Sequence, residues 1–424
     1  MFRFDIQGGT RLAGTVGVNG AKNAALPIMA AALMGAGTSR IRNVPDLRDI
    51  RTMSAILGEL GVRVERADDG TLEITVEDES RCEAPYKLVS QMRGSICVLG
   101  PLTGKRKRAR VSLPGGCVIG VRPIDLHLKG MRALGAELAL NDGYVEAATS
   151  GLRGADIYLG GAFGSTALGT CNVMMAACLA DGRTTIECAA CEPEIVDLAA
   201  FLTRMGARIE GAGSHRIVID GVRGLKGAEH EVIPDRIEAG TFIAAAAITR
   251  GRIDIDGARL EHLSAITDVL TRIGVTVERT ATGCRVLADD GFEATDVVAL
   301  PYPGVPTDMQ AQISALLATA DGISVVTDKV FPDRFMHIAE LDRMGARIRK
   351  EGPSAIIVGN SRLTGAEVMA SDLRASAALV LAGMAAEGTT IVHRVYHIDR
   401  GYERLEERLN RLGARIERAD EELT

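Results

Sequence analysis

The amino-acid sequence predicts an α/β protein of two domains, and three observations lead to this prediction. One phrase, seen in LGELGVRVE and LTRMGARIE, occurs six times at intervals of about 70 residues. Each copy has the pattern of an amphipathic helix, a glycine and an alternating strand. The chain of 424 residues is also long enough to form two separate cores. The six repeats therefore divide into three for each domain.

The glycine in each copy is predicted to end a helix. Helices commonly end with a residue in the left-handed conformation, which glycine adopts without steric cost. The strand that follows is expected to turn at a signal such as Asp69-Gly70 or Asp142-Gly143 and to return as a hairpin. The six glycines are Gly61, Gly135, Gly206, Gly274, Gly345 and Gly413.

A second phrase precedes each of these helices, most clearly in AAALMGAGTSRI and LAGMAAEGTTI. It predicts an alanine-rich helix, a glycine and a β-branched strand. The alanine-rich helix has little polar surface, so we expect it to be buried, whereas the second helix carries charge and should face solvent. Each repeat thus contains two helices and three or four strands.

The N-terminus is predicted to complete the last repeat. The sixth repeat stops at RIERADEELT without a return strand, and the N-terminal FRFDIQGG resembles the return strand RIVIDG. One domain would therefore comprise residues 21–231, and the other would comprise residues 1–20 together with residues 232–424.

Charged residues recur where the buried helices are expected to begin. Lys22 and Arg236 lie 15 residues before the glycine that follows their helices, and Asp308 and Arg374 lie 14 residues before theirs. Arg93 begins a fifth helix with looser spacing. Helix N-termini attract anions through free N–H groups and the helix dipole. Each residue alone fits a polar helix start, but four equivalent positions favour a shared cleft for phosphate or carboxylate.

The second repeat is predicted to carry an insertion after Leu99, GPLTGKRKRARVSLPGGCVIGVRP. Long irregular segments are often functional. Cys117 follows a Pro-Gly-Gly turn and precedes Arg122, a setting that can make a thiol an acid or a nucleophile. A small apolar loop residue is an equally good interpretation. The basic run KRKRAR at 105–110 is expected to be the solvated tip of a hairpin rather than a nucleic-acid site.

Composition and charge argue against several other classes of protein. The formal net charge of −6 does not favour nucleic acid. The longest apolar run, residues 24–36, is too short to span a membrane, and the start lacks the pattern of a signal peptide. Eight cysteines in such a chain indicate reduced thiols, so we expect a cytoplasmic protein. Zinc at Cys188 and Cys191 is a minor alternative, because Cys171 and Cys178 fit a buried alanine-rich helix.

Several long motifs occur together in this chain. They are NGAKNAALP at 19–27, SLPGGCVIGVRPIDLH at 112–127, EPEIVDLAAFL at 192–202, PDRIEAGTF at 234–242, PTDMQAQ at 306–312, SDLRASAALVLAG at 371–383 and HIDRGYERLEERL at 397–409. In these motifs the sequence resembles the UDP-N-acetylglucosamine 1-carboxyvinyltransferase family, over nearly its whole length. The resemblance implies two inverted α/β barrel domains of three pseudo-repeats each, with the active site in a cleft between them.

The resemblance also implies a reaction. The enolpyruvyl group of phosphoenolpyruvate would move to the 3-hydroxyl of UDP-N-acetylglucosamine, and phosphate would be released by addition and elimination. This is the first committed step of peptidoglycan synthesis. The scheme implies two small-molecule partners, no cofactor and no metal. It also implies inactivation by the covalent inhibitor fosfomycin.

Residue roles follow from the resemblance by position. Asp308 matches the base for the sugar hydroxyl, and Cys117 matches the acid that protonates the enolpyruvyl methylene and forms a covalent adduct. Residues matching those that bind phosphoenolpyruvate are Lys22, Asn23, Arg122, Arg334, Arg374 and Arg400, of which Lys22 and Arg400 are also implied in catalysis. Residues matching those that bind the UDP-sugar are Arg93, Arg122, Pro123, Ile124, Asp125, Leu126, Asp308 and Val330.

One segment departs from the family pattern and keeps alternatives open. The family usually has a lysine- or serine-containing segment before a VGAT-type helix start, where this chain has YLGGAFGSTALG. Ser165, Thr166 or backbone amides could replace those nucleotide contacts, or the sugar nucleotide could be a modified one. An enolpyruvyl-shikimate-phosphate synthase is a close alternative, but its pattern lacks the PGGC loop. A non-catalytic UDP-sugar-binding paralogue is a further alternative, and it would be expected to have lost Cys117, Asp308 or a phosphate-binding arginine, all of which are present here.

Overall fold

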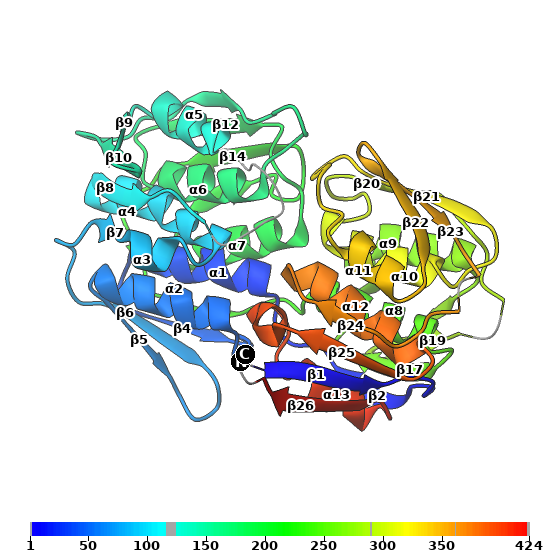
Figure 1. The fold of residues 1–424 in the computed structure, drawn as a ribbon. Helices are drawn as coiled ribbons and strands as arrows, with labels where there is room; N and C mark the ends of the chain where they lie inside the picture. The colour runs from blue at the N-terminus through cyan, green and yellow to red at the C-terminus, as the bar shows by residue number, and fades with distance from the viewer. Residues whose placement is uncertain (1, 116–123, 289–290, 361, 422–424) are drawn as a thin grey trace. The chain divides into compact units, whose positions relative to one another are not determined.

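A computed structural model describes residues 2–115, 124–288, 291–360 and 362–421, which form two compact units (Figure 1). The C-terminal unit combines Met1–Asn19 with Pro234–Thr424. The N-terminal unit contains the described residues between Gly20 and Ile233. Among the described residues, the chain passes from one unit to the other after Asn19 and after Ile233.

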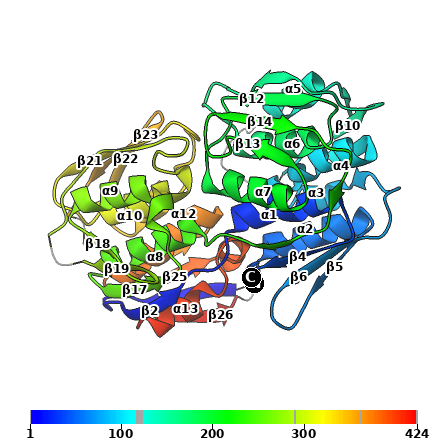
Figure 2. The same cartoon turned by 180° about the vertical axis from the view of Figure 1, so that it is seen from behind.

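The described residues form six four-stranded sheets, three in each unit, and all six have the same topology. An edge strand pairs parallel to the next strand, and the remaining two pairings are antiparallel. The buried helices lie inside each unit and the sheets lie around them, as Figures 1 and 2 show. The fold class expected from the six repeats is confirmed.

The N-terminal unit contains three repeats. The first comprises α1 (Lys22–Ala32), β3 (Gly35–Ala36), β4 (Thr38–Arg42), α2 (Arg48–Glu59), β5 (Val62–Arg66) and β6 (Leu72–Val76). The second comprises β7 (Glu83–Ala84), α3 (Tyr86–Val89), the 3-10 helix η1 (Arg93–Val98), α4 (Leu99–Arg106), β8 (Arg108–Ser112), α5 (Asp125–Ala133), β9 (Glu137–Asn141) and β10 (Tyr144–Ala148). The third comprises β11 (Asp156–Tyr158), α6 (Ala167–Ala177), β12 (Arg183–Glu187), α7 (Pro193–Arg204), β13 (Arg208–Glu210) and β14 (Arg216–Asp220), followed by β15 (Leu225–Lys226) and β16 (Glu229–Glu231).

The C-terminal unit also contains three repeats. The first comprises β2 (Ala13–Gly17), α8 (Arg236–Ile248), β17 (Arg252–Asp256), η2 (Leu260–His262), α9 (Ser264–Ile273), β18 (Thr276–Arg279) and β19 (Gly283–Leu287). The second comprises β20 (Val297–Ala299), η3 (Thr307–Met309), α10 (Gln310–Leu317), β21 (Ile323–Asp328), α11 (His337–Arg343), β22 (Arg347–Glu351) and β23 (Ser354–Val358). The third comprises β24 (Glu367–Met369), α12 (Leu373–Ala385), β25 (Thr389–His393), η4 (Val395–Arg400), α13 (Leu405–Arg411), β26 (Arg415–Asp420) and β1 (Phe2–Gln7).

Strands from distant parts of the chain complete the sheets. The N-terminal strand β1 lies between β25 and β26 and pairs antiparallel with both. Strand β2 pairs parallel with β17, although more than 200 residues separate them in the sequence. In the N-terminal unit, β16 likewise pairs parallel with β4. The C-terminal unit is therefore closed by strands from its two chain segments, and the N-terminal unit by strands from near its two ends.

The conformations of the repeated glycines explain why every second helix ends where it does. All six glycines of the recurring phrase have a positive φ, between 73° at Gly61 and 109° at Gly206. The hairpin between β9 and β10 turns at Asp142 and Gly143, both of which also have a positive φ. These predicted stop and turn signals are confirmed.

The two helix types differ in burial as their compositions predict. All thirteen residues of α8 are buried, because this alanine-rich helix packs against α10 and α12. By contrast, α9 buries only Ile266, Val269, Leu270 and Ile273, which form one stripe at helical spacing. Each unit therefore has its own mainly aliphatic core.

The predicted insertion after Leu99 is wrong in its first part, because Leu99–Arg106 forms helix α4 and Arg108–Ser112 forms strand β8. A Cβ at Gly100 would lie 2.2 Å from the backbone oxygen of Asn172 on α6. Glycine therefore allows the close approach of α4 and α6, and this helix lacks the alanine-rich signature of the others. The basic run is consequently not a hairpin tip: Arg106 donates to backbone carbonyls of Leu60 and Arg81.

Candidate active site

The N-terminal ends of α8, α10 and α12 meet in the C-terminal unit, and each has an aspartate at or before its first turn. Asp235 caps α8 by accepting from Ile237 and Glu238 N–H groups. Asp372 caps α12 in the same way, with its Oδ1 2.6 Å from the backbone nitrogen of Arg374. Asp308 lies in η3, directly before α10. The predicted convergence of these helix starts is confirmed for this unit.

Asp308 contacts two of the arginines, Arg334 and Arg374, that the family resemblance assigns to the binding of phosphoenolpyruvate. Arg334 Nη1 lies 2.6 Å from Asp308 Oδ1, and Arg374 places Nε and Nη2 3.3 and 3.2 Å from Oδ2. The side chains of Arg334 and Arg374 are 7% and 1% exposed, whereas that of Asp308 is 24% exposed. Three predicted site residues thus form one cluster with a partly open carboxylate.

The electrostatics of this cluster keep its arginines charged. Burial lowers the pKa of Arg334, but the attraction of Asp308 and Asp372 outweighs burial, so the pKa lies above its ordinary value. The pKa of Arg374 is raised for similar reasons, by Tyr402 and Asp308 against the effect of burial. Two permanent cations at the positive ends of helices make a strong site for an anionic ligand.

A buried hydrogen-bonded group of Tyr402, Thr241 and Gln312 packs beside Arg374. The Tyr402 ring lies 5.1 Å from the guanidinium of Arg374, and its hydroxyl lies 2.8 Å from Thr241 Oγ1 and 3.4 Å from Gln312 Nε2. Burial raises the pKa of Tyr402, so the phenol is neutral at physiological pH. The sequence analysis did not single out these three residues, because they come from three different repeats.

Two further predicted residues lie in the same unit. Arg400 is the last residue of η4, which packs against α12, and it is half-buried. Val330 lies two residues after β21 and donates its N–H to Asp328 Oδ1 at 2.9 Å.

In the N-terminal unit, Lys22 is the first residue of α1 and is only 7% exposed. Its Nζ lies 3.3 Å from Oδ2 of Asp49, a buried residue in the first turn of α2. Burial of a lysine requires such a partner, because an unpaired ammonium is costly to desolvate. The next residue, Asn23, is exposed. The sequence analysis missed Asp49, which lies 27 residues from its partner.

In the N-terminal unit, the described residues that the resemblance assigns to the UDP-sugar lie at the starts of two helices. Arg93 begins η1, and Asp125 begins α5 directly after Ile124. A Cβ at Gly161 would lie 3.0 Å from Leu126 Cδ1, so the departing segment at 160–170 packs beside the start of α5. In that segment Thr166 caps α6 by accepting from the Gly169 N–H at 3.2 Å.

A buried polar network holds the start of α5. Asn172 Nδ2 lies 2.9 Å from His127 Nδ1 and 3.0 Å from the carbonyl oxygen of Ile96, and Asn172 Oδ1 accepts from Gly100 N–H at 2.7 Å. Burial and Arg93 lower the pKa of His127 to about 3. His127 is therefore neutral near pH 7, and its place in the structure is that of an orienting residue rather than an acid or base.

Three predicted site residues, Cys117, Arg122 and Pro123, lie outside the described residues. Within the described ranges, no group of three or more His, Cys, Asp or Glu side chains is arranged to hold a metal ion. Cys191 contacts His215, with Sγ 3.4 Å from Nδ1. No helix in the described part of the chain is long and apolar enough to cross a membrane.

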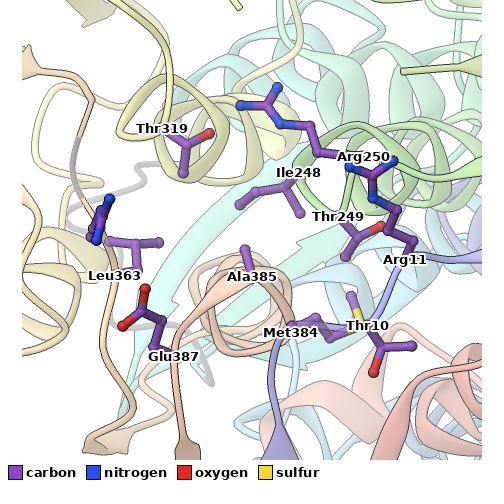
Figure 3. Close-up of a pocket in the computed structure, with 12 residues that line it drawn as sticks. Thr10, Arg11, Ile248, Thr249, Arg250, Thr319, Leu363, Met384, Ala385 and Glu387 are labelled. Atoms are coloured by element: carbon purple, nitrogen blue, oxygen red, sulfur yellow. The ribbon is translucent and has the colours of Figure 1, made fainter. Parts of the chain in front are cut away.

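A pocket of about 330 Å³ lies at the opposite, C-terminal ends of α8, α10 and α12. Figure 3 shows Arg11, Thr249 and Arg250 on one side of it and Leu363 and Glu387 on the other. Arg362 adds a third cation to the lining. Each helix C-terminus carries roughly half a negative charge, so three helix ends and Glu387 nearly balance the three arginines. Because these charges nearly balance, we assign no ligand to this pocket.

Comparisons with known proteins agree with this fold. Residues 6–409 match the family described as EPSP synthase (3-phosphoshikimate 1-carboxyvinyltransferase). The chain is 54% identical over 422 residues to a UDP-N-acetylglucosamine 1-carboxyvinyltransferase from Anaeromyxobacter sp. (strain Fw109-5), covering 99% of both chains. It is 52% identical over 418 residues to the protein of that name from Methylacidiphilum infernorum (isolate V4), again covering 99% of both.

Solved structures show the same architecture. The chain is similar to the enolpyruvyl transferase NikO from Streptomyces tendae, with a TM-score of 0.89, 27% identity and 99% of both chains covered. It also matches EPSP synthase from Acinetobacter baumannii, with a TM-score of 0.75 at 19% identity, covering 99% of this chain and 100% of that chain. The second likeness concerns the fold alone.

The fold and these relatives define an enolpyruvyl transferase. Within that class, the chain belongs to the UDP-N-acetylglucosamine 1-carboxyvinyltransferase family. The family expected from the sequence motifs is therefore confirmed.

Proposed function

We propose that this protein transfers the enolpyruvyl group of phosphoenolpyruvate to the 3-hydroxyl of UDP-N-acetylglucosamine and releases phosphate. The single observation that supports this best is the cluster in which a partly open Asp308 contacts two buried arginines. The relatives' printed name, at 54% identity over 99% of the chain, supports the choice of acceptor. The product would be the first committed intermediate of peptidoglycan synthesis.

In the proposed reaction, Asp308 accepts the proton of the sugar 3-hydroxyl as its oxygen attacks C2 of phosphoenolpyruvate. Its side chain is 24% exposed and therefore open to a substrate. An entering carboxylate would share Arg334 and Arg374 with Asp308. Asp308 would then have fewer donors and would accept a proton more readily. Binding of phosphoenolpyruvate would in this way prepare the base.

The cationic residues have separate roles in this proposal. Arg334 and Arg374 hold the carboxylate of phosphoenolpyruvate, and Lys22 and Arg400 stabilise charge on its phosphate. Arg122, which lies outside the described residues, would join the phosphate group. Asn23 would contact the reacting centre, and Arg93, residues 123–126 and Val330 would contact the UDP-sugar.

Cys117 would supply the proton that the methylene carbon C3 gains during addition. The result is a tetrahedral intermediate in which C2 carries the sugar oxygen and the phosphate. Elimination then breaks the bond between C2 and the phosphate oxygen, and C3 loses a proton to restore the double bond. The overall exchange consumes one phosphoenolpyruvate and one sugar hydroxyl and yields one enol ether and one phosphate. We propose no further partner and a cytoplasmic location.

The test is phosphate release by the purified protein with phosphoenolpyruvate, with and without UDP-N-acetylglucosamine. We expect release only with the UDP-sugar, and we expect Cys117→Ser to abolish it. Release with shikimate 3-phosphate in place of the UDP-sugar would instead support a shikimate-pathway transferase. Binding of the UDP-sugar without phosphate release would support a non-catalytic paralogue.

A further inference from the structure

Asp328 is a fully buried carboxylate at the end of β21, and the sequence motifs do not mark it. Its two oxygens have different partners. Oδ1 accepts from the N–H groups of Val330 and Phe331, at 2.9 and 2.7 Å. Oδ2 accepts from the hydroxyl of Thr307, at 2.6 Å. One side chain thus joins the turn after β21 to η3, the short helix that carries Asp308.

The hydroxyl of Thr307 has one proton, which it donates to Asp328 in a hydrogen bond. The lone pairs of the same oxygen therefore face other donors, and Arg334 Nη1 lies 3.3 Å away. The same nitrogen of Arg334 lies 2.6 Å from Asp308 Oδ1. A chain of hydrogen bonds consequently runs from Asp328 through Thr307 and Arg334 to Asp308.

The use of a carboxylate at position 328 needs an explanation. An asparagine could accept from both backbone N–H groups without burying a charge, and burial raises the pKa of Asp328 even though its hydrogen bonds lower it. What an asparagine could not do is accept from the Thr307 hydroxyl with its second atom, because that atom would be an NH₂ donor. The contact with Thr307 is therefore the feature that favours aspartate here.

We propose that Asp328 is a positioning residue, which orients the Thr307 hydroxyl as an acceptor and so holds Arg334 against Asp308. Asp328 acts through Thr307 and touches no reacting atom. The inference rests on the proposed function, because Arg334 and Asp308 are the carboxylate-binding and base residues of that reaction. It predicts that a change at a buried residue outside the substrate contacts affects the binding of phosphoenolpyruvate.

The test compares Asp328→Asn and Thr307→Val with wild type in steady-state phosphate release. Asp328→Asn keeps an acceptor for the turn but breaks the chain at Thr307, and Thr307→Val breaks it at the hydroxyl. We expect each variant to raise KM for phosphoenolpyruvate roughly tenfold to a hundredfold, the effect of weakening one hydrogen bond to a charged group. The double variant should be no worse than either single variant, because both remove the same link.

Two further variants separate positioning from a general loss of structure. Thr307→Ser retains the hydroxyl and should restore KM to near the wild-type value. Thr327→Val is the control in the residue before Asp328. It removes a hydroxyl that lies 2.7 Å from Ser354 Oγ, and it should leave KM unchanged. An unchanged KM in both Asp328→Asn and Thr307→Val, with wild type active, would overturn the inference alone. An additive double variant, or a Thr307→Ser variant as weak as Thr307→Val, would also overturn it. An inactive wild type would overturn the proposed function and this inference together.

Discussion

The three buried helices of the C-terminal unit, α8, α10 and α12, have arginines at both ends, and the arginines of the two ends have different neighbours. At the N-terminal ends, Arg334 and Arg374 are buried and contact a partly open carboxylate. At the C-terminal ends, Arg11, Arg250 and Arg362 line a pocket with Glu387. Helix dipoles add to the arginine charge at the first end and oppose it at the second. We therefore expect arginine to create an anion site only at the N-terminal ends, where the helix dipoles have the same sign as the arginine charge.

The largest effect is expected from Asp308→Asn, which keeps the shape of the side chain but removes its ability to accept a proton. We expect kcat for phosphate release to fall by roughly 10² to 10⁴, the usual contribution of a general base. Asp268→Asn is a matched control, because Asp268 is an exposed residue of α9 that pairs with Arg272. A loss of less than tenfold in Asp308→Asn would contradict the role of Asp308 as the base.

Exchanging arginine for lysine at both ends of the helices tests the comparison directly. Arg374 contacts Asp308 Oδ2 with two nitrogens, which a lysine cannot reproduce. We expect Arg374→Lys to raise KM for phosphoenolpyruvate by roughly tenfold or more. Arg362→Lys in the pocket should leave KM unchanged. An equal rise in KM in the two variants would contradict the proposal that only the N-terminal ends of the helices bind phosphoenolpyruvate.

Acidification should lower the folding stability of the protein through His337, a buried histidine near Arg334 and Asp372 at the N-terminal ends of the buried helices. Burial lowers the pKa of His337 to about 4, with Asp372 opposing this effect and Arg334 adding to it. An unfolded histidine titrates near 6.5, so the unfolded chain binds more protons between about pH 6.5 and 4. The contribution of neutral His337 to folding stability is therefore fully present above about pH 6.5, and it is lost as the pH falls through this window.

The measurement for this prediction is Tm at pH 7 and at pH 4.5. His337→Gln should lose less Tm between the two values than wild type does, by about a few degrees. His127, whose pKa is about 3, acts with the same sign in the N-terminal unit, so part of the dependence should remain. An identical loss of Tm in wild type and variant would show that His337 is not a source of the acid sensitivity.

The smallest effect is expected from Arg362→Gln. Arg362 is exposed in the pocket, and the substitution of such a residue usually changes stability by no more than about 0.5 kcal/mol. We expect Tm to fall slightly, because one counter-charge to the helix ends is lost, and kcat/KM to stay at the wild-type value. A tenfold loss of kcat/KM with unchanged Tm would give the pocket a part in the reaction and contradict the assignment made here.

Much of the fold could be predicted because its signals are local. A glycine such as Gly274 both ends a helix and adopts a φ of 101°, so its place in the sequence marks its place in the structure. Helix α4 was missed because Gly100 and Gly104 replace the alanines of the other buried helices. Close packing against α6 favours those glycines, and that packing is a tertiary fact that no local pattern contains.

The candidate site could be predicted only in part, for the same reason. Lys22, Asp308 and Arg374 lie at or beside helix starts, where charge is conspicuous in a sequence of alanines. Lys22 pairs with a buried acid of another element, Asp49. Asp328, a second buried acid, bonds Thr307 beside Asp308 from the end of a strand. Polar residues occur at strand ends for many reasons, so only the contacts in the structure reveal which groups such a residue bonds.

The position of β1 has a consequence for the order in which the chain can fold during synthesis. Strand β1 precedes the other described strands in the sequence, whereas its two neighbours, β25 and β26, follow all the others. The N-terminal unit has all its described strands once Ile233 has been synthesised. It can therefore complete its sheets on the ribosome, while residues 2–7 have no strand partner until β25 and β26 have been made.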